Sequence, residues 1–391
     1  MAIELEKRDL RSYELRKRKH KQVITAITIV AIIISLGLIG FFVKLFLNKN
    51  YSKYEVLHSM ERSDTSFSRY ESYGSGILKY SKDGAMAMDG AGNLLWNGPF
   101  EMKDPIVDIT GKYVALADRG YDTIHIFNGN GGMETVNTNN RIIKIEVANQ
   151  GVVAALLDGP DVNYIQLYTE EGSMPVDIRT LNEKDGYPVD IALSQDGRKL
   201  VTSYVSILNG VTQSKVTFYN FGGVGQNYIG KVVGGFDFGQ TIVPDVDFIN
   251  NDTVCAFGDD KFSIYSMKEK PELVYEEKLS AEVKSIIHSE KYVGLVLNND
   301  GEEKNRIVIY DLKGKVIFNE TTNLDYNKIF ISGDEVIAYS DNEWNIWNLS
   351  GSKKFHYTFD ANISYILPVN NVDKYILVDD TSINEIKLLE N

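Results

Sequence analysis

Cysteine is nearly absent from this chain of 391 residues, which contains only Cys255. A single thiol excludes an internal disulfide, so oxidative cross-links play no part in the stability of the fold. Cys255 lies in the apolar, strand-like run 253–257 with no histidine beside it. This context predicts a buried structural residue, not a metal ligand or a nucleophile.

The chain also lacks the usual signatures of metal and phosphate sites. Its five histidines are scattered and never lie at the i, i+2 or i, i+4 spacing of a zinc site. The glycine-rich segments 128–132 and 222–225 lack the Lys-Ser/Thr ending of a phosphate-binding loop, so we interpret them as loops, either hairpin loops or connections between repeats. The oxygen-rich segments 245–252 and 298–301 do not match a calcium-binding loop, which leaves calcium binding open. The sequence therefore assigns no catalytic, cofactor-binding or metal-binding residue, and no cofactor.

Positive charge is scarce outside the N-terminal region. Residues 1–53 carry 11 Lys and Arg against 4 Asp and Glu, a balance of +7, so the total of -13 leaves residues 54–391 at -20. A body this acidic repels phosphate backbones, which argues against nucleic acid as a partner.

One long apolar run stands out. Residues 23–43 contain no charged side chain over 21 positions, about the ~20 residues that cross a ~30 Å hydrocarbon core as a helix. Five Lys and Arg between Arg16 and Lys21 precede the run, so the positive-inside rule places the N-terminus in the cytoplasm and the rest of the chain outside. We predict a cytoplasmic basic tail (1–22), a single transmembrane helix (23–47) embedded in the lipid bilayer from Val23 to Leu47, a linker (48–65) and an extracytoplasmic domain (66–391).

A cleaved signal peptide is the competing interpretation of the apolar run. Its hydrophobic region would usually span ~7–15 residues and end at a small-residue cleavage site. Here the run is longer, and Phe41, Phe42 and Phe46 stand where small residues would be needed. We therefore favour an uncleaved anchor in the cell membrane.

The remainder of the chain repeats one motif, in which two apolar residues separated by one position are followed by an aromatic and a small polar residue. The aromatics of six copies are spaced 41, 51, 46, 45 and 37 residues apart: Phe127, Tyr168, Tyr219, Tyr265, Tyr310 and Trp347. Because these aromatics are equivalent in every copy, we expect them to pack between neighbouring repeats instead of lining a sugar-binding face.

Each copy lies among other strand-like segments, with an apolar strand before it that ends near an aspartate. A further strand precedes this pair and a weaker one follows it, which gives four antiparallel strands per ~40 residues, the composition of a propeller blade. Partial copies at 77–96 and 363–389 extend the array. We predict an all-β fold, a β-propeller of eight blades with seven as the alternative, preceded by one transmembrane helix. The segment between Tyr54 and Tyr70 is the candidate for the missing last strand.

A family resemblance rests on the anchor together with two motifs, Gly76-Ile-Leu-Lys-Tyr-Ser-Lys-Asp-Gly84 and Gly92-Asn-Leu-Leu-Trp96. With them the chain resembles the bacterial membrane-anchored proteins grouped as domain of unknown function 5711, whose blades are similar to quinoprotein-like and WD40-like blades. The resemblance implies a propeller in the envelope of Gram-positive anaerobes. It implies no activity and no catalytic residues.

The functional expectation follows mainly by elimination. Propellers that bind a quinone cofactor generally carry a tryptophan motif in most blades, whereas this chain has three tryptophans. We expect a non-enzymatic binding or scaffold module whose partner is an envelope protein or a glycan. The alternatives are an extracytoplasmic polysaccharide hydrolase or lyase with a site in the central channel, and a sensor that signals through its basic N-terminus.

Overall fold

The computed structural model describes residues 17, 20, 21, 24, 25, 27–38, 49–62, 68–369 and 372–390. The chain divides into two compact units, residues 1–50 and 51–391. The described residues between 17 and 38 are helical. No helix among the described residues is long and apolar enough to cross a membrane. The predicted span 23–47 includes positions 23, 26 and 39–47, and the predicted tail includes 1–16, all of which lie outside the described residues.

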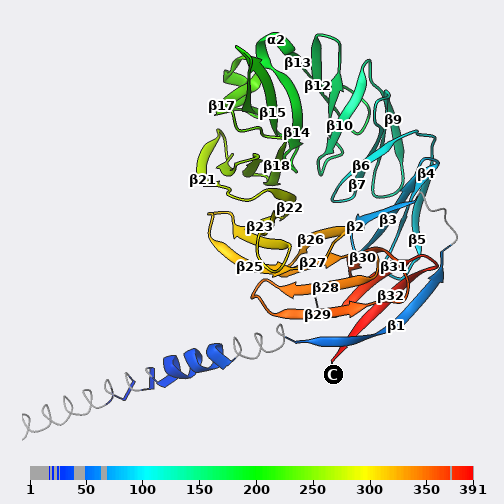
Figure 1. Cartoon of the computed structure of the whole chain (residues 1–391), viewed down its shortest axis with the longest axis vertical. Helices are drawn as coiled ribbons and strands as arrows, with labels where there is room; N and C mark the ends of the chain where they lie inside the picture. The colour runs from blue at the N-terminus through cyan, green and yellow to red at the C-terminus, as the bar shows by residue number, and fades with distance from the viewer. Residues whose placement is uncertain are drawn as a thin grey trace, which may run out of the picture. The chain divides into compact units, whose positions relative to one another are not determined.

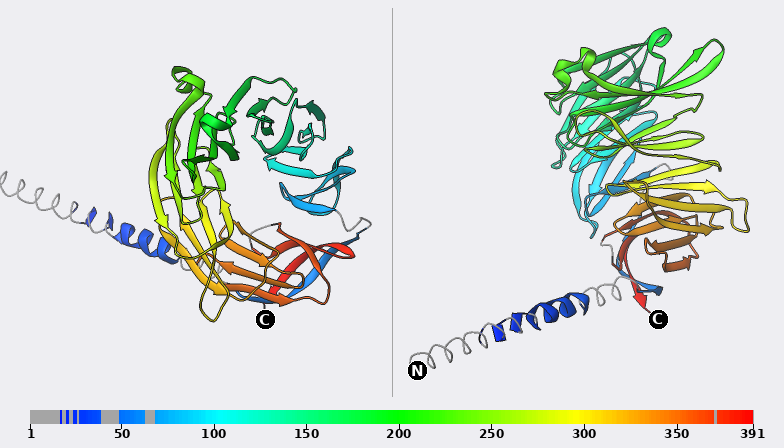
Figure 2. Two further views of the ribbon diagram at one scale, coloured as in Figure 1. Left: turned by 45° about the horizontal axis from the view of Figure 1, so that its top comes forward. Right: turned by 90° about the vertical axis from the view of Figure 1, so that its left-hand side faces the viewer.

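The second unit consists of eight four-stranded antiparallel sheets. They follow one another around the molecule in chain order, as the progression from blue to red in Figures 1 and 2 shows. We number them as blades 1 to 8, beginning with the sheet β2–β5. The prediction of an eight-bladed β-propeller is thereby confirmed.

Within each blade the first strand lies innermost and the fourth lies at the rim (Figure 1). The first strands are β2 (Arg69–Tyr73), β6 (Pro105–Thr110), β10 (Arg141–Val147), β14 (Tyr187–Leu193), β18 (Asp245–Asn250), β22 (Val283–Ser289), β26 (Lys328–Ser332) and β30 (Ile363–Pro368). The fourth strands are β5 (Leu94–Pro99), β9 (Met133–Asn137), β13 (Val176–Leu181), β17 (Val232–Gly239), β21 (Glu272–Lys278), β25 (Val316–Thr322), β29 (Lys353–Thr358) and, in blade 8, β1 (Tyr51–Glu61).

The two middle strands of each blade form its buried part. The second strands are β3 (Gly76–Ser81), β7 (Tyr113–Asp118), β11 (Val153–Asp158), β15 (Lys199–Leu208), β19 (Thr253–Phe257), β23 (Tyr292–Asn298), β27 (Glu335–Tyr339) and β31 (Lys374–Asp379). The third strands are β4 (Gly84–Met88), β8 (Thr123–Phe127), β12 (Val162–Tyr168), β16 (Val211–Asn220), β20 (Lys261–Ser266), β24 (Asn305–Asp311), β28 (Glu343–Asn348) and β32 (Ser382–Glu390). One-turn helices α2 (Asn182–Asp185), η1 (Gly225–Asn227) and η2 (Ile229–Lys231) lie in connections.

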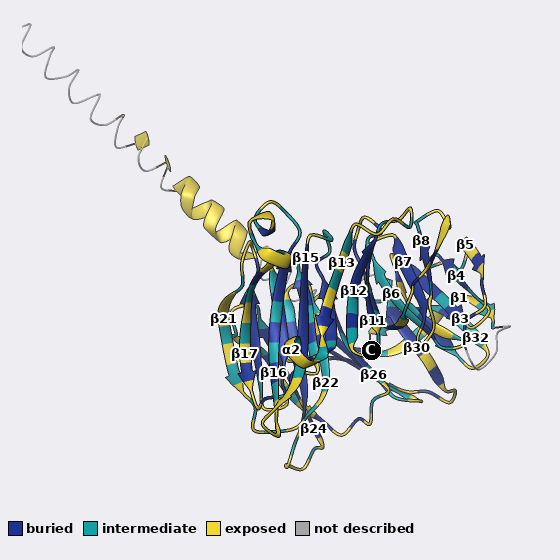
Figure 3. Ribbon diagram, turned by 90° about the horizontal axis from the view of Figure 1, so that it is seen from above, coloured by how far each residue is buried: buried dark blue, intermediate teal, exposed yellow. Residues whose placement is uncertain are grey.

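Burial on both faces explains why the middle strands read as continuous apolar runs. Every residue of β7 and β27 is buried, whereas β9 and β21 at the rim are mostly exposed. Figure 3 shows this contrast for β7 and β21. A strand covered by a neighbouring blade on each side needs apolar residues at successive positions, not alternate ones.

The repeated aromatics pack between blades, as predicted. All six are at most 5% exposed. Phe127 of blade 2 stacks on Trp96 of blade 1 with ring centroids 4.9 Å apart, and Tyr310 of blade 6 contacts Phe262 of blade 5 at 4.9 Å. Each motif therefore joins its blade to the preceding one.

The N-terminal strand β1 closes blade 8. It pairs with β32 from Tyr51 opposite Glu390 to Glu61 opposite Ser382. The last blade is therefore completed by an N-terminal strand, as expected, but this strand covers 51–61 and only overlaps the predicted segment 54–70. The propeller accordingly begins at Tyr51, not at 66, and much of the predicted linker 48–65 is strand. As a rim strand with mostly exposed side chains, β1 lacks the apolar pattern that marks the interior strands.

The two faces of the propeller differ in the connections that they carry. In an antiparallel blade, the connections from strand one to two and from three to four lie on one face, and the remaining connections lie on the other. β1 is the fourth strand of blade 8, and its first residue, Tyr51, lies opposite the end of the third strand, β32. The chain therefore enters the propeller from residue 50 on the face that carries the connections from strand three to strand four. We call this the proximal face and the opposite one the distal face.

Candidate functional site

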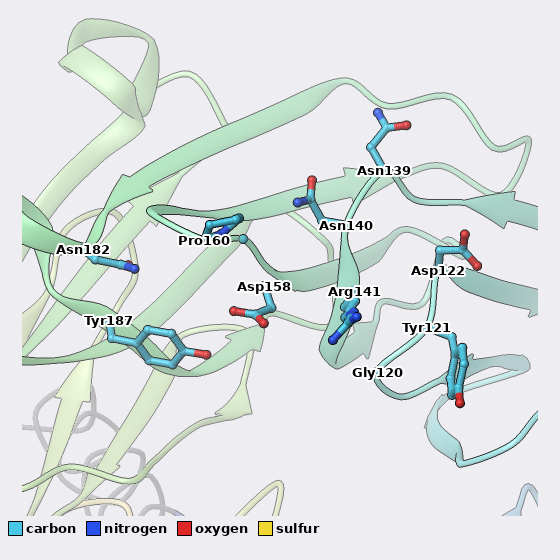
Figure 4. Close-up of a pocket in the computed structure, with 11 residues that line it drawn as sticks. Gly120, Tyr121, Asp122, Asn139, Asn140, Arg141, Asp158, Pro160, Asn182 and Tyr187 are labelled. Carbon is cyan, nitrogen blue, oxygen red and sulfur yellow. The ribbon is translucent and has the colours of Figure 1, made fainter.

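A hollow of about 770 Å³ lies on the distal face among blades 2, 3 and 4. Four connections form it: β7–β8, β9–β10, β11–β12 and β13–β14. Its side chains are aromatic, amide and charged, and they surround an open space in Figure 4. We call it the distal pocket.

Strand register positions the charged residues of the distal pocket. Arg141 begins β10 directly opposite Asp158, which ends β11. Tyr187 begins the first strand of blade 4, and burial together with a hydrogen bond to Asp158 raises the pKa of its phenol. Figure 4 shows Tyr187 and Arg141 on either side of Asp158. Tyr187 of blade 4 therefore contacts the Asp158 carboxylate of blade 3, and Arg141 begins the neighbouring strand.

Two further contacts involve other side chains that line the distal pocket. The Asn182 side-chain oxygen accepts a hydrogen bond of 2.6 Å from the fully buried Asn163. On the opposite side, the Lys103 ammonium lies 4.5 Å from the centre of the Tyr121 ring. The first contact orients the Asn182 amide, and the second places an ammonium over one face of the Tyr121 ring.

The distal pocket offers the chemistry that recognises a polyhydroxylated ligand. Tyr121 and Tyr187 are 41% and 42% exposed, so aromatic surface is open to solvent there. Asn139, Asn140 and Asp158 add amide and carboxylate groups, which together donate and accept hydrogen bonds. Within the described part of the chain, the guanidinium of Arg141 has no hydrogen bond or ion pair, so its donors are available.

A second cluster occupies the innermost strands of blades 2 to 6. The Lys144 ammonium contacts carboxylate oxygens of Asp190 at 2.6 Å and Glu146 at 3.1 Å. His288 Nε2 lies 2.5 Å from an oxygen of Asp247. The other members are Asp108 and Asp245, which interact electrostatically with the same groups. We call these seven residues the channel cluster, and five of them are carboxylic acids.

Several carboxylates of the channel cluster also link neighbouring blades. Asp108 of blade 2 accepts a hydrogen bond of 2.5 Å from the backbone N–H of Val147 in blade 3. Asp190 of blade 4 accepts one of 2.9 Å from Val246 in blade 5. These aspartates therefore stabilise the ring, and a cavity of about 360 Å³ lies beside Asp108, Lys144 and Glu146.

Crowding of buried acids alters the proton affinities in the channel cluster. Burial raises the pKa of Asp108 to about 6, against the opposing effect of N–H donors including Val147. Burial and the neighbouring Asp190 raise the pKa of Asp245 to about 6. Burial, followed by Asp108, holds the pKa of Glu146 well above its ordinary value. Burial opposes the charged form of His288, but its hydrogen bond with Asp247 prevails and raises the pKa.

These shifts predict that Asp245→Asn stabilises the protein at neutral pH. A carboxyl whose pKa is raised in the folded state favours the folded protein when it is protonated, fully so below pH ~4. This contribution to stability is lost as pH rises through about 6, where the buried group ionises. At pH 7 we expect D245N to raise the free energy of unfolding by about 1–2 kcal/mol, since ~1.4 kcal/mol corresponds to a tenfold change in proton affinity and solvent in the channel weakens the effect. Denaturant unfolding between pH 4 and 8 measures it. The exposed control D300N should change stability by less than ~0.5 kcal/mol, and an equal or lower stability of D245N at pH 7 would contradict the interpretation.

The structure separates most of the residues that the sequence singled out. Cys255 is fully buried in β19, as predicted. Segments 128–132 and 222–225 lie in the β8–β9 and β16–β17 connections, so their interpretation as loops is confirmed. In the oxygen-rich segment 245–252, Asp252 binds Lys199 at 2.7 Å, away from Asp245 on the inner strand. The described residues contain no group of three or more acidic, histidine or cysteine side chains arranged to hold a metal.

Neither the distal pocket nor the channel cluster was predicted as a site from the sequence. A partial signal existed for the cluster, because Lys144 and Glu146, like Asp245 and Asp247, stand two residues apart, the spacing that places side chains on one face of a strand. The pocket had no such signal, since its residues come from four separate connections.

The eight sheets form a closed ring, which defines the protein as an eight-bladed β-propeller. A polar pocket lies on one of its faces. Residues 47–388 match the model of a family of unknown function, DUF5711. The chain belongs to this family, as its short motifs predicted.

Solved structures support the same fold. BamB from Moraxella catarrhalis aligns with a TM-score of 0.53 and 10% identity over 86% of this chain and 100% of that one. Sqt1 from Saccharomyces cerevisiae aligns with a TM-score of 0.57 and 12% identity over 88% of this chain and 100% of that one. Identities this low show the fold alone. No curated protein matches the chain.

Proposed function

We propose that this protein is a membrane-anchored, extracytoplasmic β-propeller that binds an envelope glycan in its distal pocket without chemical turnover. Residues Val23 to Leu47 cross the bilayer once, with the N-terminus in the cytoplasm. The uncharged run 23–43 and its basic flank support the anchor. The alternative partner of the same module is an envelope protein that binds the distal loops.

The composition of the distal pocket carries the glycan proposal. Exposed tyrosine rings can stack on the apolar faces of sugar rings, while the amides of Asn139 and Asn140 and the Arg141 guanidinium can satisfy sugar hydroxyls. Such sites generally combine aromatic surface with a few placed polar groups. The pocket bears both carboxylates and a cation, which suits a neutral or mixed-charge ligand better than a polyanion.

Retention on bacterial cell-wall glycans tests this function. The probes are insoluble peptidoglycan for co-sedimentation and its soluble muropeptides for calorimetric titration with the propeller, residues 49–391. Tyr187→Ala and Arg141→Ala should each weaken binding about tenfold or more, the loss that ~1.4 kcal/mol of missing contacts produces.

Arg179→Ala is the matched control for Arg141→Ala. Arg179 lies on β13 at the rim of the same blade, its side chain 70% exposed, and the variant should bind like the wild type. Failure of the wild type to bind either probe, or equal binding by R141A and R179A, would refute the glycan site.

The channel cluster supports a second candidate, a polysaccharide hydrolase or lyase. Carboxyl groups with pKa near 6, as at Asp108 and Asp245, are suited to proton transfer at neutral pH. The same peptidoglycan incubated with the wild type should then release new reducing ends or unsaturated products, and D108N should abolish the release. The binding proposal expects no release from any of these proteins.

A further inference from the structure

The β16–β17 connection of blade 4 presents an unusually exposed apolar side chain on the proximal face. Ile229 is 99% exposed. It is followed by Gly230 and Lys231 with φ of 64° and 62°, a left-handed pair that makes a tight turn after Ile229. Local backbone geometry therefore holds an isoleucine away from the core.

Three lysines lie in this connection and in the β20–β21 connection of blade 5, where Glu269 stands between two of them. Lys270, in the β20–β21 connection of blade 5, has its ammonium 5.1 Å from the centre of the Tyr228 ring. The same connection carries Lys268, and both lysines are exposed. The Asn220 side-chain amide donates a hydrogen bond of 3.0 Å to the backbone oxygen of Glu269, which ties the two connections together. We call Tyr228, Ile229, Lys231, Lys268 and Lys270 the Ile229 patch.

Charge divides unequally between the two faces. The connections on the proximal face, including residues 369–373, contain eight Lys and Arg and nine Asp and Glu. The distal connections, without residues 62–68, carry five Lys and Arg and seventeen Asp and Glu. An anionic surface would repel the distal face strongly and the proximal face hardly at all.

The N-terminal segment also joins the propeller on the less acidic, proximal face, because residue 50 leads into β1 there. We propose that the proximal face lies against the outer surface of the anionic lipid bilayer, with Ile229 inserted at the headgroup boundary and the three lysines of the patch beside phosphates. An apolar side chain flanked by lysines is the composition of interfacial membrane contacts. This inference rests on the proposed membrane anchor. It directs the distal pocket away from the bilayer, toward the cell wall.

A fluorophore on the full-length chain tests the orientation. Ile229→Cys is labelled with an environment-sensitive dye, and the matched control is Ile207→Cys, which lies in the β15–β16 hairpin of the same blade but on the distal side and is 75% exposed. Cys255 is buried, so only the introduced thiol reacts. Both proteins are reconstituted into vesicles of phosphatidylethanolamine with phosphatidylglycerol.

We expect a blue shift and a several-fold rise in emission at position 229, quenched by lipids with nitroxide-labelled acyl chains, and no change at position 207. Lys231→Glu and Lys270→Glu should each reduce the fraction of inserted dye about fivefold or more. Flotation of the vesicles reports the anchor separately. Protein that floats while position 229 stays unchanged, or while position 207 responds instead, overturns the orientation only. Protein that does not float overturns the anchor and the orientation together.

Discussion

Replacing Lys354 by methionine should lower the free energy of unfolding of the propeller by about 3–5 kcal/mol. The side chains of Lys354 and Glu335 are 4% and 3% exposed and form an ion pair inside the junction of blades 7 and 8. Tyr375 of blade 8 donates a hydrogen bond of 2.7 Å to the other carboxylate oxygen. Loss of the ammonium leaves a buried carboxylate without its counter-ion, which is why a single substitution is so costly.

Denaturant unfolding of residues 49–391 measures this effect, and the chain supplies a matched control. Lys353 is the adjacent residue of β29 and is exposed, so K353M should change stability by less than ~0.5 kcal/mol. The double variant E335Q/K354M should regain most of the loss, because a neutral amide can still accept the Tyr375 hydrogen bond. Equal effects of K353M and K354M would show that the pair is not buried.

The sequence predicted those elements whose environment repeats in every blade. The middle strands are buried on both faces, so each carries a continuous apolar run, and an aromatic such as Phe127 or Tyr310 recurs because every junction must be filled. Blade number and fold class followed from that period. The rim strand β1 was partly missed, because a strand exposed on one side shows only a weak apolar pattern.

The candidate sites could not be predicted in the same way. Each member of the channel cluster looks like an ordinary polar residue on its own strand, and its altered pKa arises only where strands from five blades meet. Lys354 and Glu335 are likewise separated by 19 positions and read as surface charges until blade 8 covers them. Contacts between side chains that are distant in the sequence depend on how the strands and blades pack, which no local pattern encodes.

Ring closure by β1 is the central claim about the fold, because it completes blade 8 and brings the chain into the propeller on the proximal face. A disulfide between β1 and β32 tests it with the largest expected effect after Lys354. Glu55 lies directly opposite Lys387, and opposed antiparallel residues have Cα atoms about 4.5–5.5 Å apart, within the range that a disulfide bridges. The bond would close nearly the whole propeller and stabilise it by up to ~5 kcal/mol.

The decisive measurement is the yield of this disulfide in E55C/K387C under mild oxidation of the folded protein, followed by mass spectrometry. The control E55C/K374C places the second thiol one strand further away, on β31 opposite Lys387, about 10 Å from Glu55 and out of reach. We expect nearly complete cross-linking of E55C/K387C, a marked rise in its denaturation midpoint, and none in the control. Free thiols in both folded variants, or equal cross-linking of the two, would contradict closure of the propeller by β1.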